Sequence, residues 1–337
     1  MKLNQLLGMA ALLLFAAVSV ASPCVAIGTS RGGPLMFSWI DAKGCGAARV
    51  YVSNFHGPSG VQIFPQEGQS QKPCGYLSGR SGIHYANKIF VDQHENLWVA
   101  NGYDYNILEF AKNATQPKRI LQDPAGEPYS VVFDEKAGAL YVGNVYDQSH
   151  SISIQVYARG HDRPSRELSL PSNVVPYSLA IDNEGNLYMM APYPYPPDGV
   201  GVFEWYEGEG PMRDLGIFGG FSSAGIHTTS SGSLTLCSAF SFNQVYKSCW
   251  LVPPGFTMPV DDIVTNQVEV FDSTITADEK KLFLVQPSQV SEYLWPGSRF
   301  TAPINQFSTN PDVEGIAVSP AAPPGRPYLS AVAPRRF

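Results

Sequence analysis

The stretch Val131-Val132-Phe133-Asp134-Glu135-Lys136-Ala137-Gly138-Ala139-Leu140-Tyr141-Val142-Gly143-Asn144 decides the fold of this chain. Two apolar runs flank a turn that contains Gly138, a residue that adopts left-handed backbone conformations without strain. The stretch therefore predicts a β-hairpin. Its second run returns every 43 to 48 residues as a short apolar strand, and the copies begin at Val50, Leu97, Leu140, Leu187, Leu234 and Leu282.

A strand-built repeat of this length is typical of a β-propeller. After the hairpin, residues 152–157 alternate with period two, which predicts a half-buried third strand. Residues 166–170 are more polar and predict a short outer strand. A four-stranded blade cannot bury both of its faces alone, so the units must close into a ring. We predict an all-β, six-bladed β-propeller with four-stranded antiparallel blades.

The number of blades depends on how the two ends of the chain pair. Residues 313–331 contain only two strand-like runs, so they cannot form a complete blade by themselves. The simplest closure makes residues 315–318 the innermost strand of the blade that begins near Arg49, which gives six blades. A seven-bladed ring is the alternative. We assign residues 36–320 to the propeller and residues 321–337 to a Pro-rich C-terminal tail.

The N-terminus has the features of an export signal. Lys2 precedes an apolar run at residues 6–21, which is shorter than the about 20 residues that a membrane span needs. Ser19 and Ala21 provide the small residues of a cleavage site. We predict a signal peptide at residues 1–21, a linker at residues 22–35, and a secreted or periplasmic protein; an uncleaved anchor and a lipidated Cys24 are the alternatives.

The composition agrees with many short strands joined by turns. Only 15% of the residues are charged, while the chain has 31 Gly and 28 Pro. The net charge of −7 argues against nucleic acid as a partner, because phosphate neutralisation needs basic patches. No second segment is long and apolar enough to span a membrane. We expect a monomer.

Five cysteines in an exported chain predict disulfides. Cys237 and Cys249 lie nearly symmetrically about a predicted turn, so they are expected to face each other across a hairpin. Cys45 and Cys74 lie in the same repeat unit and form the second expected pair. Cys24 is left over, and no CxxC or Cys/His zinc spacing occurs.

Ligands of propellers usually bind at the mouth of the central channel, so polar and aromatic side chains just ahead of each inner strand are candidates for binding. These positions contain the candidate ligand-binding residues His84, Tyr85, Tyr129 and Tyr177. Aromatic rings at a pocket rim can stack on apolar or sugar ligands. The alternative is that the tyrosines only wedge neighbouring blades apart.

Asp272 and Glu314 are the acidic residues at these positions. Two carboxylates that converge on a channel can bind a hard divalent cation such as Ca²⁺ or Mg²⁺, or can polarise a water molecule. They are therefore the candidate metal ligands. Apart from such a divalent cation, we expect no cofactor. The alternative is that one acid caps a turn and the other is solvated.

Other polar residues of the repeat are expected to be structural. Asparagines end three of the repeated strands, and acids open three of the turns; both residue types bond local backbone groups. The residues are Asn54, Asn101, Asn144, Asp92, Asp134 and Asp182. The Pro- and Tyr-rich run at residues 191–198 is either a binding loop or a stiff connector.

The hairpin quoted above and Leu179-Ala180-Ile181-Asp182-Asn183-Glu184-Gly185-Asn186-Leu187-Tyr188 resemble the NHL and YVTN repeats of β-propellers. The wider superfamily includes regucalcin-like gluconolactonases and strictosidine-synthase-like proteins. The resemblance implies that Glu314, in the Glu314-Gly315 pair, binds a metal ion. It also implies that Asp272 is the counterpart of the Asp that the family uses on another inner strand. No Asn counterpart is found, and Ile316 and Ala317 replace the usual Trp or Pro.

Two functional hypotheses follow. The first is an exported, non-enzymatic scaffold that binds a protein, peptide or glycan, because the repeat is clear and no complete catalytic set accompanies it. The second is a metal-dependent hydrolase or lactonase that uses Glu314 and Asp272. No G-x-S-x-G nucleophile motif or phosphate-binding loop is present.

Overall fold

The computed structural model describes residues 37–55, 59–67, 72–145, 152–171, 174–192, 199–218, 222–242, 245–255, 261–264, 270–296, 302–329 and 335–336. All of them belong to the unit Met36–Phe337. The expected signal peptide and linker, Cys24, and residues 193–198 of the Tyr-rich run lie outside the described residues.

The described strands form six antiparallel sheets, which are the blades of the propeller. From the innermost strand outward, blade 1 contains β25 (Val313–Ser319), β2 (Arg49–Asn54), β3 (Gly60–Pro65), β4 (Gly75–Ser78) and β1 (Trp39–Ile40). Blade 2 contains β5 (Ala86–Val91), β6 (Leu97–Asn101), β7 (Asn106–Phe110) and β8 (Arg119–Gln122). Blade 3 contains β9 (Glu127–Asp134), β10 (Ala139–Val145), β11 (Ser153–Tyr157) and β12 (Arg166–Ser169).

The other three blades repeat this plan. Blade 4 contains β13 (Ser178–Ile181), β14 (Leu187–Pro192), β15 (Val200–Trp205), β16 (Arg213–Phe218) and β26 (Arg335–Arg336). Blade 5 contains β17 (Ser222–Thr228), β18 (Leu234–Phe242), β19 (Val245–Val252) and β20 (Asp261–Val264). Blade 6 contains β21 (Asp272–Ile275), β22 (Lys281–Gln286), β23 (Gln289–Leu294) and β24 (Asn305–Ser308). The short helices are α1 (Ala42–Cys45), η1 (Gly79–Ser81), η2 (Gly102–Asp104) and η3 (Tyr206–Gly208).

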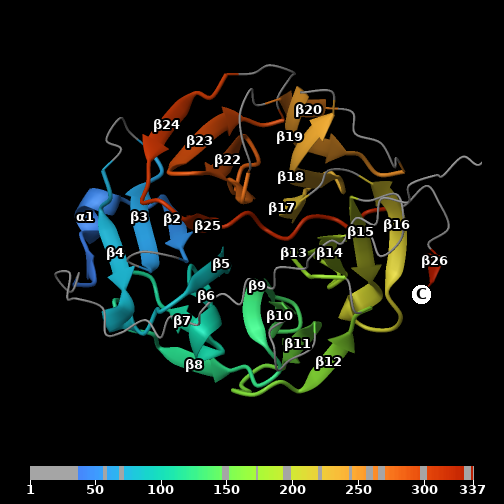
Figure 1. The fold of residues 1–337 in the computed structure, drawn as a ribbon, viewed down its shortest axis with the longest axis horizontal. Coiled ribbons are helices and arrows are strands. Elements are labelled where there is room, and N and C mark those ends of the chain that lie inside the picture. Colours follow the sequence, from blue (N-terminus) through green and yellow to red (C-terminus); the bar gives the residue numbers. More distant parts are fainter. Residues whose placement is uncertain are drawn as a thin grey trace, which may run out of the picture. The chain divides into compact units, whose positions relative to one another are not determined.

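The six blades close into a ring, as the repeat predicts (Figure 1). Each inner strand contacts the inner strands of both neighbouring blades, from β25 through β5, β9, β13, β17 and β21 back to β25. The closure uses the C-terminal strand: β25 pairs with β2, with Val318 opposite Val50 and Ile316 opposite Val52. The six-bladed prediction is confirmed, and the seven-bladed alternative is wrong.

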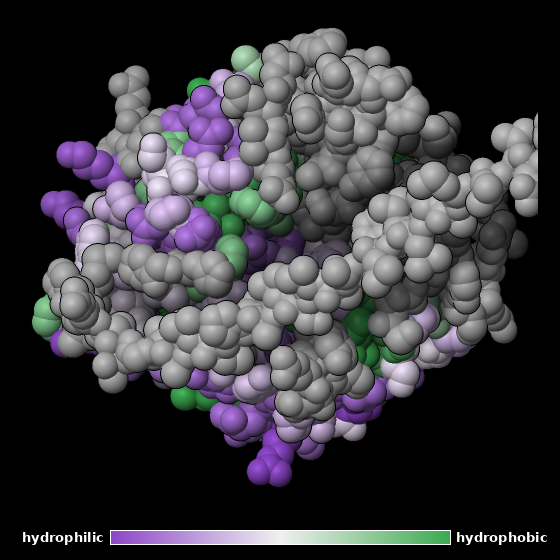
Figure 2. Space-filling view, viewed as in Figure 1, coloured by the Kyte–Doolittle hydropathy of each residue, from purple (hydrophilic) through white to green (hydrophobic). Residues whose placement is uncertain are grey.

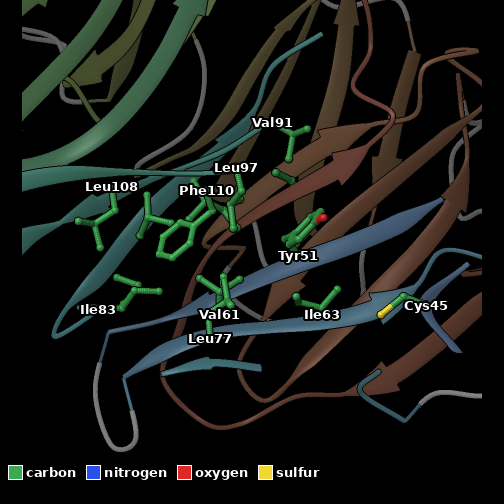
Figure 3. Close-up of a cluster of buried hydrophobic side chains, with 14 of the residues drawn as sticks. Cys45, Tyr51, Val61, Ile63, Leu77, Ile83, Val91, Leu97, Leu108 and Phe110 are labelled. Carbon is green, nitrogen blue, oxygen red and sulfur yellow. The ribbon is translucent and has the colours of Figure 1, made fainter. Parts of the chain in front are cut away.

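The blades pack face to face through apolar side chains. Figure 3 shows this core between blades 1 and 2, where side chains of β2, β3 and β4 face those of β5, β6 and β7. Val61, Ile63 and Leu77 on one side, and Leu97 and Phe110 on the other, are each at most 3% exposed. The outer strands β8, β12 and β24 each have one buried residue between exposed ones, and Figure 2 shows hydrophilic side chains along the rim beside β8 and β12. Burial between blades therefore holds the ring together.

Side chains also bond to the free edges of the inner strands. The Ser53 hydroxyl of blade 1 donates to the Asn87 carbonyl of blade 2, at 2.6 Å. The Ser130 hydroxyl of blade 3 donates to the Pro176 carbonyl of blade 4, at 2.7 Å. These inter-blade bonds satisfy backbone groups that have no partner strand on the channel side.

The turn acids brace the hairpins, as expected. Asp92 Oδ1 accepts hydrogen bonds from the backbone N–H groups of His94 and Asn96, at 2.9 and 2.8 Å. Its Oδ2 accepts from Trp98 Nε1 at 3.0 Å. Asp134 and Asp182 accept backbone N–H bonds in the same way. The structural interpretation of these acids is confirmed.

Both expected disulfides are present. Cys45 pairs with Cys74 and ties α1 to the loop before β4. Cys237 pairs with Cys249 across β18 and β19, where the two residues are register partners. Two disulfides suggest an oxidising compartment. None of the helices in the described part of the chain is long and apolar enough to cross a membrane.

After β25, residues 320–329 cross the middle of the ring toward β14 and β16 (Figure 1). We name this segment the C-terminal strap. It forms single bridges between Ala321 and Thr276 of blade 6, and between Gly325 and Asp182 of blade 4. The Gly325 N–H also donates to Thr228 Oγ1 at 2.9 Å. Because β25 belongs to blade 1, the strap ties opposite sides of the ring together.

Candidate functional site

Each inner strand begins at the same end of the channel, and we call this end the mouth. The inner strands can be aligned at their far ends, where one residue of each blade occupies the equivalent position. These residues are Asp92, Asp134, Asp182, Thr229, Thr276 and Ser319. Counting back by five residues gives the equivalent mouth positions, which are Asn87, Tyr129, Tyr177, Ala224, Phe271 and Glu314. Tyr129, Tyr177 and Glu314 were predicted from the sequence, whereas Asn87 was missed.

At the mouth, Tyr129 contacts both Glu314 and Tyr177. The Tyr129 hydroxyl donates to Glu314 Oε1. The rings of Tyr129 and Tyr177 meet edge to face with their centroids 5.8 Å apart. Burial raises the pKa of the Tyr129 hydroxyl well above its usual value, and the charges of Glu314 and Asp272 raise it further. Tyr129 therefore stays protonated and holds the Glu314 carboxylate by donation.

Tyr85 lies in a second group of rings on the same end. Its ring stacks on Tyr103 at 4.2 Å and meets Phe55 edge to face at 5.6 Å. Burial raises the pKa of Tyr85 to about 12, and the carboxylates of Glu127 and Glu314 contribute to the shift. Tyr103 is 64% exposed, so this group of rings is open to solvent.

Asn101 positions the loop that carries His84 and Tyr85. Asn101 Oδ1 accepts the backbone N–H groups of both residues, at 2.9 and 3.1 Å. The side chain of His84 is 54% exposed and its Nδ1 lies 2.6 Å from Asp104 Oδ2. The four predicted ligand-binding residues therefore do not form one group. The rings of Tyr129 and Tyr177 contact each other, Tyr85 stacks on Tyr103, and His84 contacts Asp104.

Glu127, which lies beside the Tyr85 ring, was also not predicted from the sequence. Glu127 Oε1 accepts a hydrogen bond from Asn87 Nδ2 at 3.2 Å. A Cβ at Gly102 would lie 2.8 Å from both Glu127 Oε1 and Tyr85 Cδ1. The carboxylate, the ring and the glycine therefore converge, and residue 102 has no room for a side chain unless its neighbours move.

Asp272 follows Phe271, the mouth position of blade 6, and is buried. It pairs with Lys88 of β5, which lies on the other side of β25 from β21. Lys88 Nζ lies 2.8 Å from Asp272 Oδ1, and the two side chains are 5% and 7% exposed. Asp272 Oδ2 accepts the Ile316 N–H at 3.0 Å. Burial raises the pKa of Asp272, against the lowering effect of Lys88, and the net shift is upward.

The glycine of the Glu314-Gly315 pair has a packing reason. A Cβ at residue 315 would lie 2.8 Å from Lys88 Cα and 2.8 Å from Ser53 Oγ. Gly315 therefore lets β25 and β5 approach closely, so that Lys88 can reach Asp272 past β25. Its N–H donates to Ser53 Oγ at 2.8 Å.

The channel contains a cavity of about 110 Å³, and Lys88 and Asp272 are among the residues that line it. The inner strands of all six blades line it, and residues 321–324 of the strap border it at the end opposite the mouth. The volume is enough for several water molecules, since one needs about 10–15 Å³ in this measure. Of the six predicted site residues, only Asp272 lines this cavity.

His227 is the titratable side chain of blade 5 in this cavity. Its Nε2 lies 3.0 Å from the Ser273 carbonyl oxygen, to which it must donate. Burial lowers the pKa of His227 to about 4, and the bond to Ser273 opposes that shift. The imidazole is therefore neutral at neutral pH and has a structural bond to blade 6.

The predicted metal ligands Asp272 and Glu314 lie in the same region. Within the described ranges, no three His, Cys, Asp or Glu side chains come together in a group that could hold a metal ion. Asp272 begins β21 and Glu314 lies near the start of β25, so both residues are placed toward the same end of the channel. Lys88 places an ammonium group of the chain itself beside Asp272.

Comparison with known proteins supports the fold. The structure is similar to that of a functionally unknown protein from Desulfotomaculum acetoxidans DSM 771, with 12% identity, a TM-score of 0.52, and coverage of 78% of this chain and 82% of that one. It is also similar to a protein of unknown function from Bacteroides caccae, with 10% identity, a TM-score of 0.56, and coverage of 81% and 99%. Neither a family model nor a curated protein matches the sequence. At this identity the likeness shows the β-propeller fold alone.

Proposed function

We propose that this protein is a non-enzymatic binding scaffold that is secreted or periplasmic, and that a protein, peptide or glycan docks at the mouth of its channel. The observation that supports this most is the group of tyrosine rings at the mouth, in which Tyr103 is 64% exposed and stacks on Tyr85. Exposed aromatic rings beside polar groups are frequent anchors of binding interfaces. The two disulfides support an oxidising compartment.

The test is binding of the disulfide-intact protein to peptide and glycan arrays, followed by titration of the best ligand against two variants. Tyr103→Ala removes a ring at the mouth, and Tyr206→Ala removes a ring that is 54% exposed. Tyr206 follows β15, whose direction places it at the end of the ring opposite the mouth. We expect Tyr103→Ala to weaken binding by at least about fivefold, an effect of about 1 kcal/mol, while Tyr206→Ala leaves it unchanged. Equal effects of the two variants would contradict the proposal.

A metal-dependent hydrolase or lactonase, in line with the resemblance to the gluconolactonase-like propellers, is the second candidate. It is favoured by the placement of Asp272 and Glu314 toward the same end of the channel, where Glu314 accepts a hydrogen bond from the Tyr129 hydroxyl. The pairing of Asp272 with Lys88 weighs against it, because an adjacent ammonium group repels a second cation. Calorimetric titration with Ca²⁺, Mg²⁺, Mn²⁺ and Zn²⁺ separates the two candidates: stoichiometric heat that disappears in Asp272→Asn would favour the enzyme.

A further inference from the structure

The cavity in the channel has a polar side and an apolar side. The register of the inner strands places one residue of each blade at the same level, two positions before the far-end residues. These residues are Phe90, Val132, Ala180, His227, Thr274 and Ala317, and all of them line the cavity. His227 and Thr274 belong to the adjacent blades 5 and 6, whereas Phe90 and Val132 belong to blades 2 and 3 across the ring. A molecule in this cavity therefore meets hydrogen-bonding groups on one side and hydrocarbon on the other.

Two polar groups on the side of blades 5 and 6 have unused hydrogen-bonding capacity. His227 Nε2 donates to the Ser273 carbonyl oxygen at 3.0 Å, so Nδ1 of the neutral ring is an acceptor, and no described residue donates to it. Within the described ranges the Thr274 hydroxyl also makes no hydrogen bond, although Thr274 is only 8% exposed. Since a buried polar group without a partner is destabilising, both groups favour a bound molecule that supplies the missing bonds.

Aromatic and strap residues form the apolar side. Phe90 and Phe133 are half-buried and line the cavity, as do residues 321–324 of the strap. Water gains few hydrogen bonds against such a wall, whereas an apolar group that leaves water to contact it is stabilised. The cavity of about 110 Å³ has room for about eight water molecules, which corresponds to one organic molecule of about ten non-hydrogen atoms.

The charged groups that line the cavity already have partners in the chain. Lys88 and Asp272 pair with each other, and Glu135 accepts the backbone N–H of Gln93 at 2.6 Å. Burial lowers the pKa of His227 to about 4, so the imidazole carries no charge at neutral pH. An ionic ligand would lose its hydration without gaining an unpaired counter-charge, so the site favours a neutral molecule. Exposed Gln93 is part of the lining, so the cavity reaches the surface beside the strap.

From this arrangement we infer that the cavity binds a small neutral amphiphile of the class of aromatic or alicyclic alcohols, with its hydroxyl group toward His227 and Thr274 and its ring against Phe90 and residues 321–324. The ligand hydroxyl donates to His227 Nδ1 and accepts from the Thr274 hydroxyl, so both groups gain a bond. This site is separate from the mouth and takes a different class of ligand, so the inference goes beyond the proposed function and does not depend on it.

The test is calorimetric titration of the disulfide-intact protein with benzyl alcohol, benzylammonium and benzoate, which are similar in size and of which only the first is neutral. We expect benzyl alcohol to bind with a Kd of about 1 mM or below, and the two ions to bind at least about tenfold more weakly. The ¹⁵N signal of His227 Nδ1 should shift as benzyl alcohol binds, because this nitrogen accepts a hydrogen bond. Absence of heat and of a shift up to about 10 mM benzyl alcohol would mean that the cavity holds water alone, and would overturn the inference. Equal affinity for the three compounds would overturn it as well.

The substitution Thr274→Val keeps the shape of the side chain and removes the hydroxyl. It should weaken binding of benzyl alcohol about two- to tenfold and leave binding of toluene, which has no hydroxyl, unchanged. The matched control is Thr235→Val, because Thr235 is a buried threonine of blade 5 that is not part of the cavity lining. Equal effects of the two substitutions, or an equal loss of toluene binding in Thr274→Val, would overturn the assignment of the site. Tyr103→Ala at the mouth should leave benzyl alcohol binding unchanged, so failure of this inference and failure of the proposed function are distinguishable.

Discussion

The buried pair of Lys88 and Asp272 gives the sharpest prediction, through the substitution Lys88→Met. Methionine keeps most of the apolar stem but leaves the Asp272 carboxylate without its cation in a site that is 7% exposed. Removal of one partner of a buried pair costs about 3–5 kcal/mol of unfolding free energy. Because the Ile316 N–H still donates to Asp272 Oδ2 at 3.0 Å, we expect a value near the lower end of this range, about 3 kcal/mol.

The pH dependence of this loss provides an internal check. The folded-state pKa of Asp272 is raised, and Lys88 is the largest influence that lowers it. A carboxyl group with a raised folded pKa binds a proton more tightly in the folded state, so stability falls as pH rises from its unfolded value, about 4, through its folded value. Lys88→Met raises the folded pKa further, so the destabilisation should be larger at pH 8 than at about pH 4.

Urea denaturation followed by tryptophan fluorescence at both pH values measures the effect. The control is Lys88→Met/Asp272→Asn, in which no charge remains and the Ile316 N–H keeps an acceptor. We expect the double variant to recover at least about 1 kcal/mol relative to Lys88→Met at pH 8. A pH-independent difference, or a loss below about 1 kcal/mol in Lys88→Met, would refute the interpretation of this pair as a mutually dependent buried ion pair.

Three further predictions concern the strap, a disulfide and the cavity. Gly325→Ala places a Cβ 2.3 Å from the Thr229 backbone nitrogen, so it should lower the unfolding free energy by about 1–3 kcal/mol. It should also speed hydrogen exchange in residues 321–329, and unchanged exchange would show that the strap does not depend on this contact. Replacing Cys237 and Cys249 by Ser opens a loop with a sequence separation of 12 and should lower the unfolding free energy by about 3 kcal/mol, and a thermal melt identical to the wild type would contradict this. The imidazole of His227 should titrate near pH 4 by NMR, with stability lost as pH falls from about 6.5 toward that value, and a midpoint at the ordinary value would mean that the ring is solvated.

Much of the fold could be predicted because its information is local and repeated. The apolar strand beginning at Leu140 and the turn containing Gly138 specify one hairpin, and recurrence of the pattern specifies the blade. The pairing of β25 with β2 was predictable because the C-terminal run lacked partners of its own. The disulfide between Cys237 and Cys249 was predictable for the same reason, since both cysteines belong to one hairpin.

The candidate site was only partly predictable. Tyr129 and Tyr177 stand in matched Pro-Tyr-Ser copies, so their equivalent positions were visible in the sequence. The offset of five residues from the turn would also have identified Asn87. No local signal indicates that Lys88 reaches Asp272, because 184 residues separate them and the contact exists only after the ring closes.

Taken alone, the order of amino acids determined the strands, the turns and the blade as a unit, because each follows from hydrophobic periodicity and turn chemistry over a few residues. It favoured six blades and left seven as the alternative. Only the tertiary structure decided that Lys88 neutralises Asp272, that Glu127 borders Tyr85, and that the Pro-rich residues 320–329 lie across the ring. These features depend on how sheets from distant parts of the chain are placed around one axis, and that placement is set by packing between blades, which no single repeat contains.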